Sequence, residues 1–204
     1  MSLRKLDTIG DEPISLNFTK SYLRVEHDDD DGLITDFIKT ARSTIEAYTS
    51  RALCSQAWEF RVNAGFAVAR SDGEYLSQSK SRGNHGLELP RSPFQDLSEA
   101  PSLETSYGVK TLTDFRVDKS GRTARIHFGP TALSLFDGSG TICIRFQAGY
   151  EPDDLPASLK QAMLLIVSQL YNNRMAVNDN PGLLGAFDSS VLQLLKPYQI
   201  KRVS

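Results

Sequence analysis

The spacing of apolar residues along this 204-residue chain changes twice, from helical to alternating and back to helical. Between residues 31 and 50 apolar positions recur every three or four residues, as on one face of an amphipathic helix. Over about 56–149 the clearest segments alternate apolar and polar residues, which is the period of a strand. Helical spacing returns over about 157–174 and again near the C-terminus. This order predicts an α+β fold: a helical core (long helix about 31–50 and helix about 157–174), an inserted antiparallel β region (about 56–149) and a short C-terminal helix.

Four consecutive aspartates, Asp28 to Asp31, stand directly before the long helix, and Ser15 stands before a shorter one that runs to about Leu23. Serine is a preferred N-cap, and carboxylates at a helix start accept free backbone N–H groups and offset the macrodipole by about 0.3–1 kcal/mol each. A calcium loop of the EF-hand type does not fit, because Gly32 at its sixth position would place His27 first and an isoleucine last. We therefore interpret the aspartates as helix-capping groups, with weak metal binding and catalysis as the lesser alternatives.

Three segments carry the alternating pattern of the β region most clearly. They are "QAWEFRVN" (56–63), "FRVDKSGRTARIHF" (115–128), which reads as a hairpin, and "TICIRFQAGY" (141–150). Pro90 and Pro93 limit the segment around them to a sheet edge. Residues 67–86 are polar and rich in Ser and Gly, which predicts a long loop.

The helix predicted over 157–174 is apolar on nearly all sides, because Leu164, Leu165 and Val167 lie outside its main apolar stripe. Such a helix must be covered either by its own domain or by a neighbouring subunit. Residues 175–190 contain Pro and Gly and predict a flexible link, which would end in a docking segment over 191–204. A helix that folds back on its own core is the alternative for that segment. We treat residues 1–204 as one domain.

Composition and charge exclude several classes of protein. The net charge is −2, so no overall basic field indicates nucleic acid. Residues 1–50 hold 6 Lys/Arg against 10 Asp/Glu, and residues 155–204 hold 5 against 2, so the acidic front and basic tail could meet between copies. The two cysteines, Cys54 and Cys143, are far apart and predict reduced, buried thiols. Neither a signal peptide nor a membrane-spanning run is visible, so we expect a soluble product of a bacterial cytoplasm.

The sequence offers no residue set typical of catalysis. His27, His85 and His127 share no metal-ligand spacing, and the "GSG" at 138–140 lacks the strand–turn–helix surroundings of a nucleophile elbow or a dinucleotide site. We therefore predict no catalytic residue, no metal and no cofactor.

Several short motifs occur in a characteristic order. They are Leu23-Arg24-Val25, the aspartates 28–31, Tyr48-Thr49-Ser50-Arg51-Ala52-Leu53, Gln56-Ala57-Trp58, Ala148-Gly149-Tyr150, Pro156, Gln161-Ala162, Tyr171, Arg174 and "LLKPY" at 194–198. Together they resemble the head–tail connector (adaptor) family of tailed double-stranded DNA phages and gene-transfer-type particles. The loop over 67–86 departs from that pattern, so its role stays open.

The resemblance implies a structural protein of the virion neck, encoded by a phage, a prophage or a gene-transfer particle. Such proteins form a ring of about 12 copies on the portal protein, extend the DNA channel and meet the next neck or tail-completion protein, with DNA only as passing cargo. A cyclic ring needs one surface to fit a different surface of the next copy.

The resemblance and the patterns above together assign candidate residues. The portal-docking candidates are Leu194, Leu195, Pro197, Tyr198, Lys201 and Arg202. The subunit-interface candidates are Leu164, Leu165, Val167, Asp29 and Asp30. One alternative function is a small phage DNA-binding or metal-dependent DNA-processing protein that uses the aspartates and the tail lysines. Another is a neighbouring neck or tail-completion protein.

Overall fold

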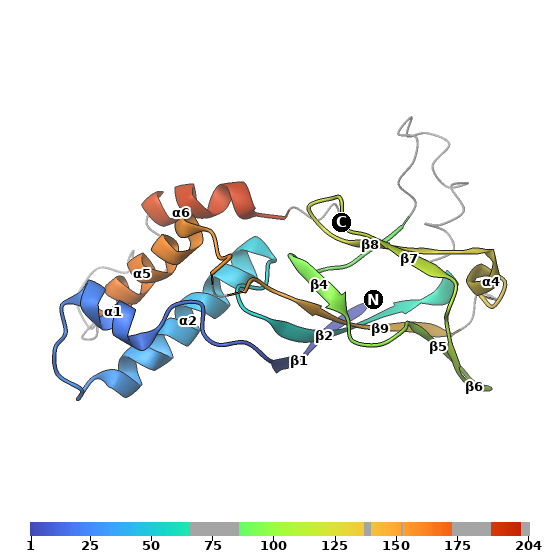
Figure 1. Cartoon of the computed structure of the whole chain (residues 1–204), viewed down its shortest axis with the longest axis horizontal. Helices are drawn as coiled ribbons and strands as arrows, with labels where there is room; N and C mark the ends of the chain where they lie inside the picture. The colour runs from blue at the N-terminus through green and yellow to red at the C-terminus, as the bar shows by residue number, and fades with distance from the viewer. Residues whose placement is uncertain (66–85, 137–139, 152, 173–188, 201–204) are drawn as a thin grey trace, which may run out of the picture. The chain divides into compact units, whose positions relative to one another are not determined.

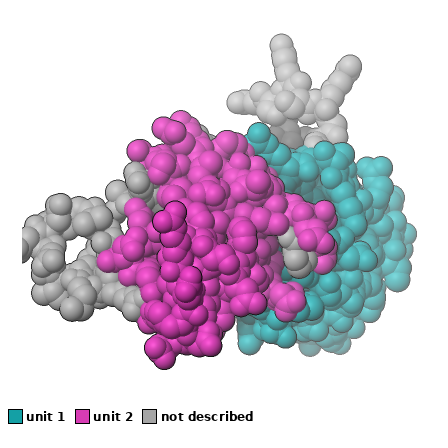
Figure 2. Space-filling view, turned by 60° about the vertical axis from the view of Figure 1, so that its left-hand side comes forward, with its two compact units in different colours: residues 1–9, 55–149 teal, residues 10–54, 150–204 magenta. Residues whose placement is uncertain are grey.

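The chain divides into two compact units, and each unit combines an N-terminal stretch with a later one (Figure 2). Unit 1 contains residues 1–9 and 55–149, and unit 2 contains residues 10–54 and 150–204. The computed structural model describes residues 1–65, 86–136, 140–151, 153–172 and 189–200. The predicted loop over 67–86 and most of the predicted link over 175–190 lie outside these described residues. The predicted α+β class is confirmed, because the β insertion forms unit 1 and the helices gather in unit 2; the single-domain assignment stays a prediction.

Unit 1 is built from two antiparallel sheets and a short helix (Figure 1). Its elements are β1 Ser2–Thr8, β2 Gln56–Asn63, β3 Leu87–Glu88, β4 Phe94–Leu97, β5 Ser102–Thr105, β6 Gly108–Thr111, β7 Phe115–Asp118, β8 Arg125–Phe128, α4 Pro130–Leu133 and β9 Thr141–Ala148. The larger sheet has the order β1-β2-β9-β5-β6, and β4 also pairs with β9. The smaller sheet has the order β3-β8-β7.

The centre of the larger sheet is the pairing of β2 with β9 over their full lengths, from Gln56–Ala148 to Asn63–Thr141. The predicted alternation is confirmed, because the apolar positions of both strands are buried. These buried residues are Trp58, Phe60, Val62, Ile142, Ile144, Phe146 and Ala148. The hairpin predicted over 115–128 is also confirmed, with Phe115 opposite Phe128. Its turn begins after Asp118, which still pairs with Arg125.

The sequence patterns missed three strands of the larger sheet, namely β1, β5 and β6. β1 and β6 are its edge strands, and β6 is exposed at all four residues. An edge strand buries little, so its sequence does not need to alternate apolar and polar residues. The two edge strands are therefore defined mainly by backbone pairing, β1 with β2 and β6 with β5, rather than by their side chains.

The face of the sheet opposite the apolar one carries a cluster of ion pairs around Glu59, which is almost fully buried. Arg145 Nε donates to Glu59 Oε2 at 3.0 Å, and Arg61 Nη1 lies 3.7 Å from Glu59 Oε1. Arg145 also binds Glu99, and Arg61 also binds Glu104. The hydrogen bond from Arg145 holds the pKa of Glu59 below its usual value. Because its partners are positive, this buried carboxylate stays ionised and links β2 to β9.

Unit 2 is helical, and its helices agree closely with the predicted ones. They are α1 Leu16–Leu23, α2 Asp31–Thr49, α5 Ala157–Asn172, α6 Ser189–Leu195 and the 3₁₀ helix η2 Lys196–Tyr198. The predicted cap of α1 is confirmed, since Ser15 Oγ accepts the N–H of Phe18 at 3.3 Å. The C-terminal helix is shorter than the predicted segment: α6 ends at Leu195, and Pro197 lies within η2. No described helix has the length and apolar character to cross a membrane.

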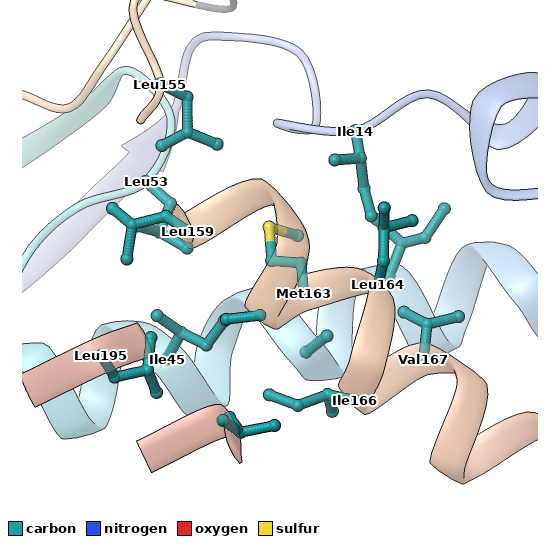
Figure 3. Close-up of a cluster of buried hydrophobic side chains, with 14 of the residues drawn as sticks. Ile14, Ile45, Leu53, Leu155, Leu159, Met163, Leu164, Ile166, Val167 and Leu195 are labelled. Atoms are coloured by element: carbon teal, nitrogen blue, oxygen red, sulfur yellow. The ribbon is translucent and has the colours of Figure 1, made fainter. Parts of the chain in front are cut away.

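The helices of unit 2 share one apolar core, and α5 contributes the largest part of it (Figure 3). Its buried side chains are Leu159, Ala162, Met163, Leu164, Ile166 and Val167. α2 covers α5 with Ile34, Ile38, Ala41 and Ile45, and α6 adds Val191 and Leu195. Ile14, Leu53 and Leu155 complete the core from the connecting segments. The chain itself therefore covers the helix that is apolar on nearly all sides.

Replacing Glu59 with glutamine should destabilise unit 1, because two arginines would lose the carboxylate they share. We expect the free energy of unfolding to fall by about 1–2 kcal/mol at pH 7, since one partner, Arg145, is partly exposed and its charge is screened. The carboxylate stabilises the fold fully above the ordinary pKa of an unfolded glutamate. That stabilisation is lost as the pH falls through the lowered pKa of the folded state. The difference from wild type should therefore narrow below about pH 4.5.

Urea unfolding followed by the fluorescence of Trp58, the only tryptophan of the chain, measures this effect within unit 1. Glu99→Gln is the matched control, because its carboxylate is exposed and binds the same arginine; it should change stability by less than about 0.5 kcal/mol. Equal stability of Glu59→Gln and wild type at pH 7 would show that the ion-pair cluster does not hold the sheet.

Candidate functional site

The segments that the motifs single out are held on unit 2 by three sets of polar contacts. We call residues 27–31 the acidic turn, and we call residues 196–200 together with Thr49, Arg51 and Tyr150 the C-terminal clasp. The third set surrounds Arg42 on α2. Each set ties a connecting or terminal segment to a helix.

In the acidic turn, Lys20 of α1 binds two of the four aspartates. Its Nζ lies 2.6 Å from Asp28 Oδ1 and 2.6 Å from Asp31 Oδ1. The hydrogen bond to Asp28 raises the pKa of Lys20, and the same hydrogen bond lowers the pKa of Asp28. Both groups therefore stay charged at neutral pH, and Lys20 joins α1 to the start of α2.

A third aspartate of the acidic turn connects to α5. Asp30 is the N-cap residue of α2, but its side chain caps no backbone N–H; instead, Asp30 Oδ2 accepts the hydroxyl of Tyr171 at 2.7 Å. The predicted capping hydrogen bonds are therefore wrong at this position. Asp31 does lie in the first turn of α2, where its charge favours the macrodipole. Asp29 points to solvent, with His27 Nδ1 at 3.9 Å.

The acidic turn is a structural tie between α1, α2 and α5, and it does not have the geometry of a metal site. Among the described residues no group of three or more His, Cys, Asp or Glu side chains is placed to hold a metal ion. Lys20 already balances Asp28 and Asp31, the two carboxylates that it brings together.

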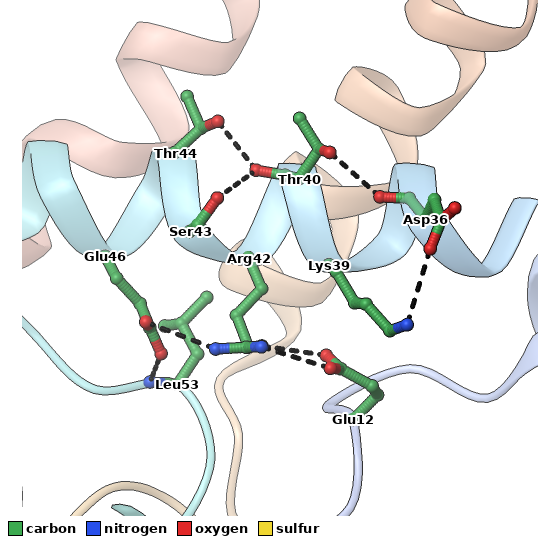
Figure 4. A network of polar contacts seen from close by, with 9 residues as sticks. All are labelled: Glu12, Asp36, Lys39, Thr40, Arg42, Ser43, Thr44, Glu46 and Leu53. Atoms are coloured by element: carbon green, nitrogen blue, oxygen red, sulfur yellow. Dashed lines mark hydrogen bonds and ion pairs between the residues drawn. The ribbon is translucent and has the colours of Figure 1, made fainter. Parts of the chain in front are cut away.

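Arg42, in the middle of α2, holds the segment before α1 directly and the segment after α2 through Glu46 (Figure 4). Its guanidinium makes a two-point contact with Glu12, Nε to Oε2 at 2.8 Å and Nη2 to Oε1 at 3.1 Å. Arg42 Nη1 also donates to Glu46 at 3.4 Å, and Glu46 Oε1 accepts the buried N–H of Leu53 at 2.9 Å. One arginine thus fixes the segment that enters α1 and, through Glu46, the segment that leaves α2.

The C-terminal clasp brings together three motifs that are far apart in the sequence. Arg51 Nε donates to the carbonyl of Tyr198 at 2.8 Å, and Arg51 Nη1 donates to the hydroxyl of Tyr150 at 3.1 Å. The N–H of Ile200 donates to the carbonyl of Thr49 at 3.0 Å. The arginine after α2, the tyrosine before α5 and the "LLKPY" ending therefore meet at one place. Sequence reasoning identified each motif but gave no sign that they touch.

The structure separates the portal-docking candidates by burial. Leu195 is fully buried in the core of unit 2, and Leu194 and Tyr198 pack against that core while partly exposed. Pro197 is exposed. Lys201 and Arg202 lie outside the described residues. Within the described segment, Pro197 is therefore the docking candidate most open to a partner.

The subunit-interface candidates are separated in the same way. Leu164 and Val167 are buried in their own core, so in this structure they have no surface to offer a second copy. The helical spacing of apolar residues could not show that the rest of unit 2 would bury them. Leu165 is partly exposed, Asp29 is exposed, and Asp30 is partly buried against Tyr171. An interface role stays a prediction for all five residues.

Comparison with known proteins finds a family that matches part of the chain. Residues 13–80 match the family of phage gp6-like head–tail connector proteins, so the resemblance predicted from the motifs is confirmed for this part of the chain. That stretch includes α1, the acidic turn, α2 and β2. No curated protein matches the sequence.

Three solved chains share the fold over its whole length, each with 21% identity and with coverage of 100% of this chain and 98% of the other. One comes from the neck of an empty GTA particle computed with C6 symmetry, with a TM-score of 0.70. Another comes from the virion of a native gene transfer agent (GTA) particle, also at 0.70. The third comes from the neck of a native GTA particle computed with C12 symmetry, at 0.66.

Replacing Arg51 with alanine should loosen the C-terminal clasp without unfolding unit 2. Residues 196–200 would lose one charge-assisted hydrogen bond, while Val191 and Leu195 would keep α6 on the core. We expect hydrogen exchange at the amide of Ile200 to accelerate about tenfold, which corresponds to a hydrogen bond worth about 1–2 kcal/mol. Lys39→Ala, an exposed change on α2, is the control and should leave this rate unchanged. Unchanged exchange at Ile200 in Arg51→Ala would contradict the clasp.

Proposed function

We propose that this chain is a structural head–tail connector of the virion neck. It forms a ring on the portal, extends the DNA channel and joins the head to the tail of a phage or gene-transfer-type particle. The head–tail connector match over residues 13–80 carries the proposal, because it rests on sequence and includes the motifs around α1 and α2. The likeness in fold to chains of GTA necks extends that support to the rest of the chain.

The proposed role needs surfaces rather than reacting groups, and the polar contacts of unit 2 are consistent with it. Lys20, Arg42 and Arg51 each hold a connecting segment against a helix. Contacts of this kind fix the shape of a surface without offering a nucleophile or a general base. We therefore assign no catalytic, metal-binding or cofactor-binding residue.

The proposed partners are a portal protein, the next neck or tail-completion protein, and further copies of this chain. A cyclic ring of about 12 copies accords with the C12 symmetry of one similar neck, and a six-fold arrangement accords with the C6 symmetry of the other. DNA is cargo that passes through the ring. The net charge of −2 suits a channel to which DNA must not adhere.

The alternative of a metal-dependent DNA-processing protein finds no support in the acidic turn. Such an enzyme would need carboxylates free to bind a divalent ion. Asp28 and Asp31 instead share the ammonium group of Lys20, and Asp30 accepts a hydrogen bond from Tyr171. We therefore do not propose this function.

Deleting the gene should give particles whose heads and tails fail to join. Electron microscopy should show full or leaky heads apart from finished tails, because the ring that links them would be missing. Restoring the gene on a plasmid is the control and should restore tailed particles. Normal tailed particles in the deletion strain would refute the proposed function.

Reversing the charge of the last two basic residues tests the docking end. Removing residues 191–204 would be a poor test, because it would also take Val191 and Leu195 out of the core. The double variant Lys201→Glu/Arg202→Glu leaves that core intact and should reduce co-purification with the portal at least about tenfold. Its matched control, Arg116→Glu/Arg122→Glu, reverses two exposed charges on unit 1 and should co-purify normally. Equal portal binding by wild type and the tail variant would argue against docking through these residues.

A further inference from the structure

The exposed large apolar side chains of unit 1 lie only at its two sheet edges, as far as the residues are described. Tyr107 is 96% exposed and Val109 is 69% exposed, and both belong to the hairpin that joins β5 to β6. Leu6 is 44% exposed and Ile9 is 54% exposed, and both lie in or directly after β1. We call the first pair the hairpin patch and the second pair the β1 patch.

The two patches lie at opposite ends of one sheet. The order β1-β2-β9-β5-β6 places three strands between the edge that carries the β1 patch and the edge that carries the hairpin patch. The β5–β6 hairpin reaches past the neighbouring strands of unit 1 (Figure 1). Two different apolar patches at opposite edges are what a head-to-tail contact between identical chains requires.

The hairpin presents its tyrosine in a fixed position. Thr105 Oγ1 accepts the N–H of Tyr107 at 3.3 Å and donates to the carbonyl of Gly108 at 3.1 Å. Gly108 has a φ of +129°, which a residue with a side chain rarely adopts. An exposed tyrosine on an ordered turn loses little conformational entropy when it binds, which is typical of residues that dominate an interface.

The β1 edge favours contact through side chains rather than extension of the sheet. The pairing of β1 with β2 shifts register between Lys5 and Asp7, at the position of Leu6. Such an irregularity, together with the charges of Arg4 and Lys5, opposes backbone pairing with a further strand. The apolar side chains of Leu6 and Ile9 nevertheless stay open to solvent.

We infer that Tyr107 and Val109 of one copy pack against Leu6 and Ile9 of the next, so that the two edges of the larger sheet join neighbouring subunits. This inference rests on the proposed function, which requires a ring, and it names the surfaces that build the ring. A second copy is the occupant that accounts for both patches together. A foreign partner on one edge would leave the other edge exposed.

Cross-linking between variants that each carry one added surface cysteine tests the contact. Both native cysteines are buried, so Tyr107→Cys and Leu6→Cys each add one reactive thiol to the surface. A short bismaleimide should join the two variants when they are mixed, and it should join neither variant to itself. The matched control pairs Tyr107→Cys with Phe18→Cys, an exposed position of unit 2, and should give no product. A Tyr107→Cys homodimer, or the absence of a mixed product under conditions where the chain self-associates, would overturn the inference.

Sedimentation equilibrium of the purified chain supplies an independent measurement. Tyr107→Ser and Leu6→Ser should each raise the Kd of self-association at least about tenfold, while Phe18→Ser should not change it. Circular dichroism shows that each variant is folded. Unchanged association in both edge variants would overturn the inference. The purified chain could be monomeric at every concentration. In that case both cysteines are introduced into one chain, and the cross-linker is applied to assembled particles. A ladder of cross-linked oligomers is then expected, and its absence would overturn the inference.

The outcomes separate the two proposals. Chains that are present in particle necks but do not cross-link there would refute the edge contact and leave the proposed function standing. Purified chains that cross-link through the two edges but are absent from particles would support the contact and refute the neck role.

Discussion

The packing of α5 inside unit 2 is the constraint on which the rest of the structure depends. This helix is apolar on nearly all sides, so α2, α6 and three connecting segments must surround it. Residues before position 54 and after position 150 therefore have to fold together, although about a hundred residues separate them in the sequence. The intervening stretch must start and end close together. The antiparallel pairing of Gln56 with Ala148 meets that requirement within unit 1.

Charged residues hold the connecting segments while apolar residues form the core. Lys20, Arg42 and Arg51 each bind a segment outside the element that carries them: the acidic turn, Glu12, and the pair of Tyr150 and Tyr198. Both partners are largely buried only in the pair of Arg42 with Glu46, and removing one of them would leave the other charge without compensation, which costs more than the pair itself contributes. The shape of the helical surface therefore depends on a few arginine and lysine side chains, whereas its stability depends mainly on α5.

The sequence predicted the elements that bury a regular apolar face and missed those that do not. α2 and β9 follow directly from the spacing of their apolar residues. Ile34, Ile38 and Ile45 of α2 are buried in unit 2, and Ile142, Ile144 and Phe146 of β9 are buried in unit 1. β1 and β6 were missed because edge strands need no such face. The acidic turn was recognised but misinterpreted. Local rules predict capping from four aspartates, whereas their actual partners, Lys20 and Tyr171, come from other helices and no local rule identifies them.

The C-terminal segment combines residues that serve the fold with neighbouring residues that stay exposed. Sequence alone left open whether this segment folds back on its core or binds a partner. In the structure Val191 and Leu195 point inward and are fully buried, while Pro197, two residues after Leu195, is exposed. Arg51 holds this segment through the backbone carbonyl of Tyr198, so this hydrogen bond does not involve the tyrosine side chain. Docking through Pro197 and the basic residues that follow would then leave α6 in place, because the fully buried core positions, Val191 and Leu195, are different residues.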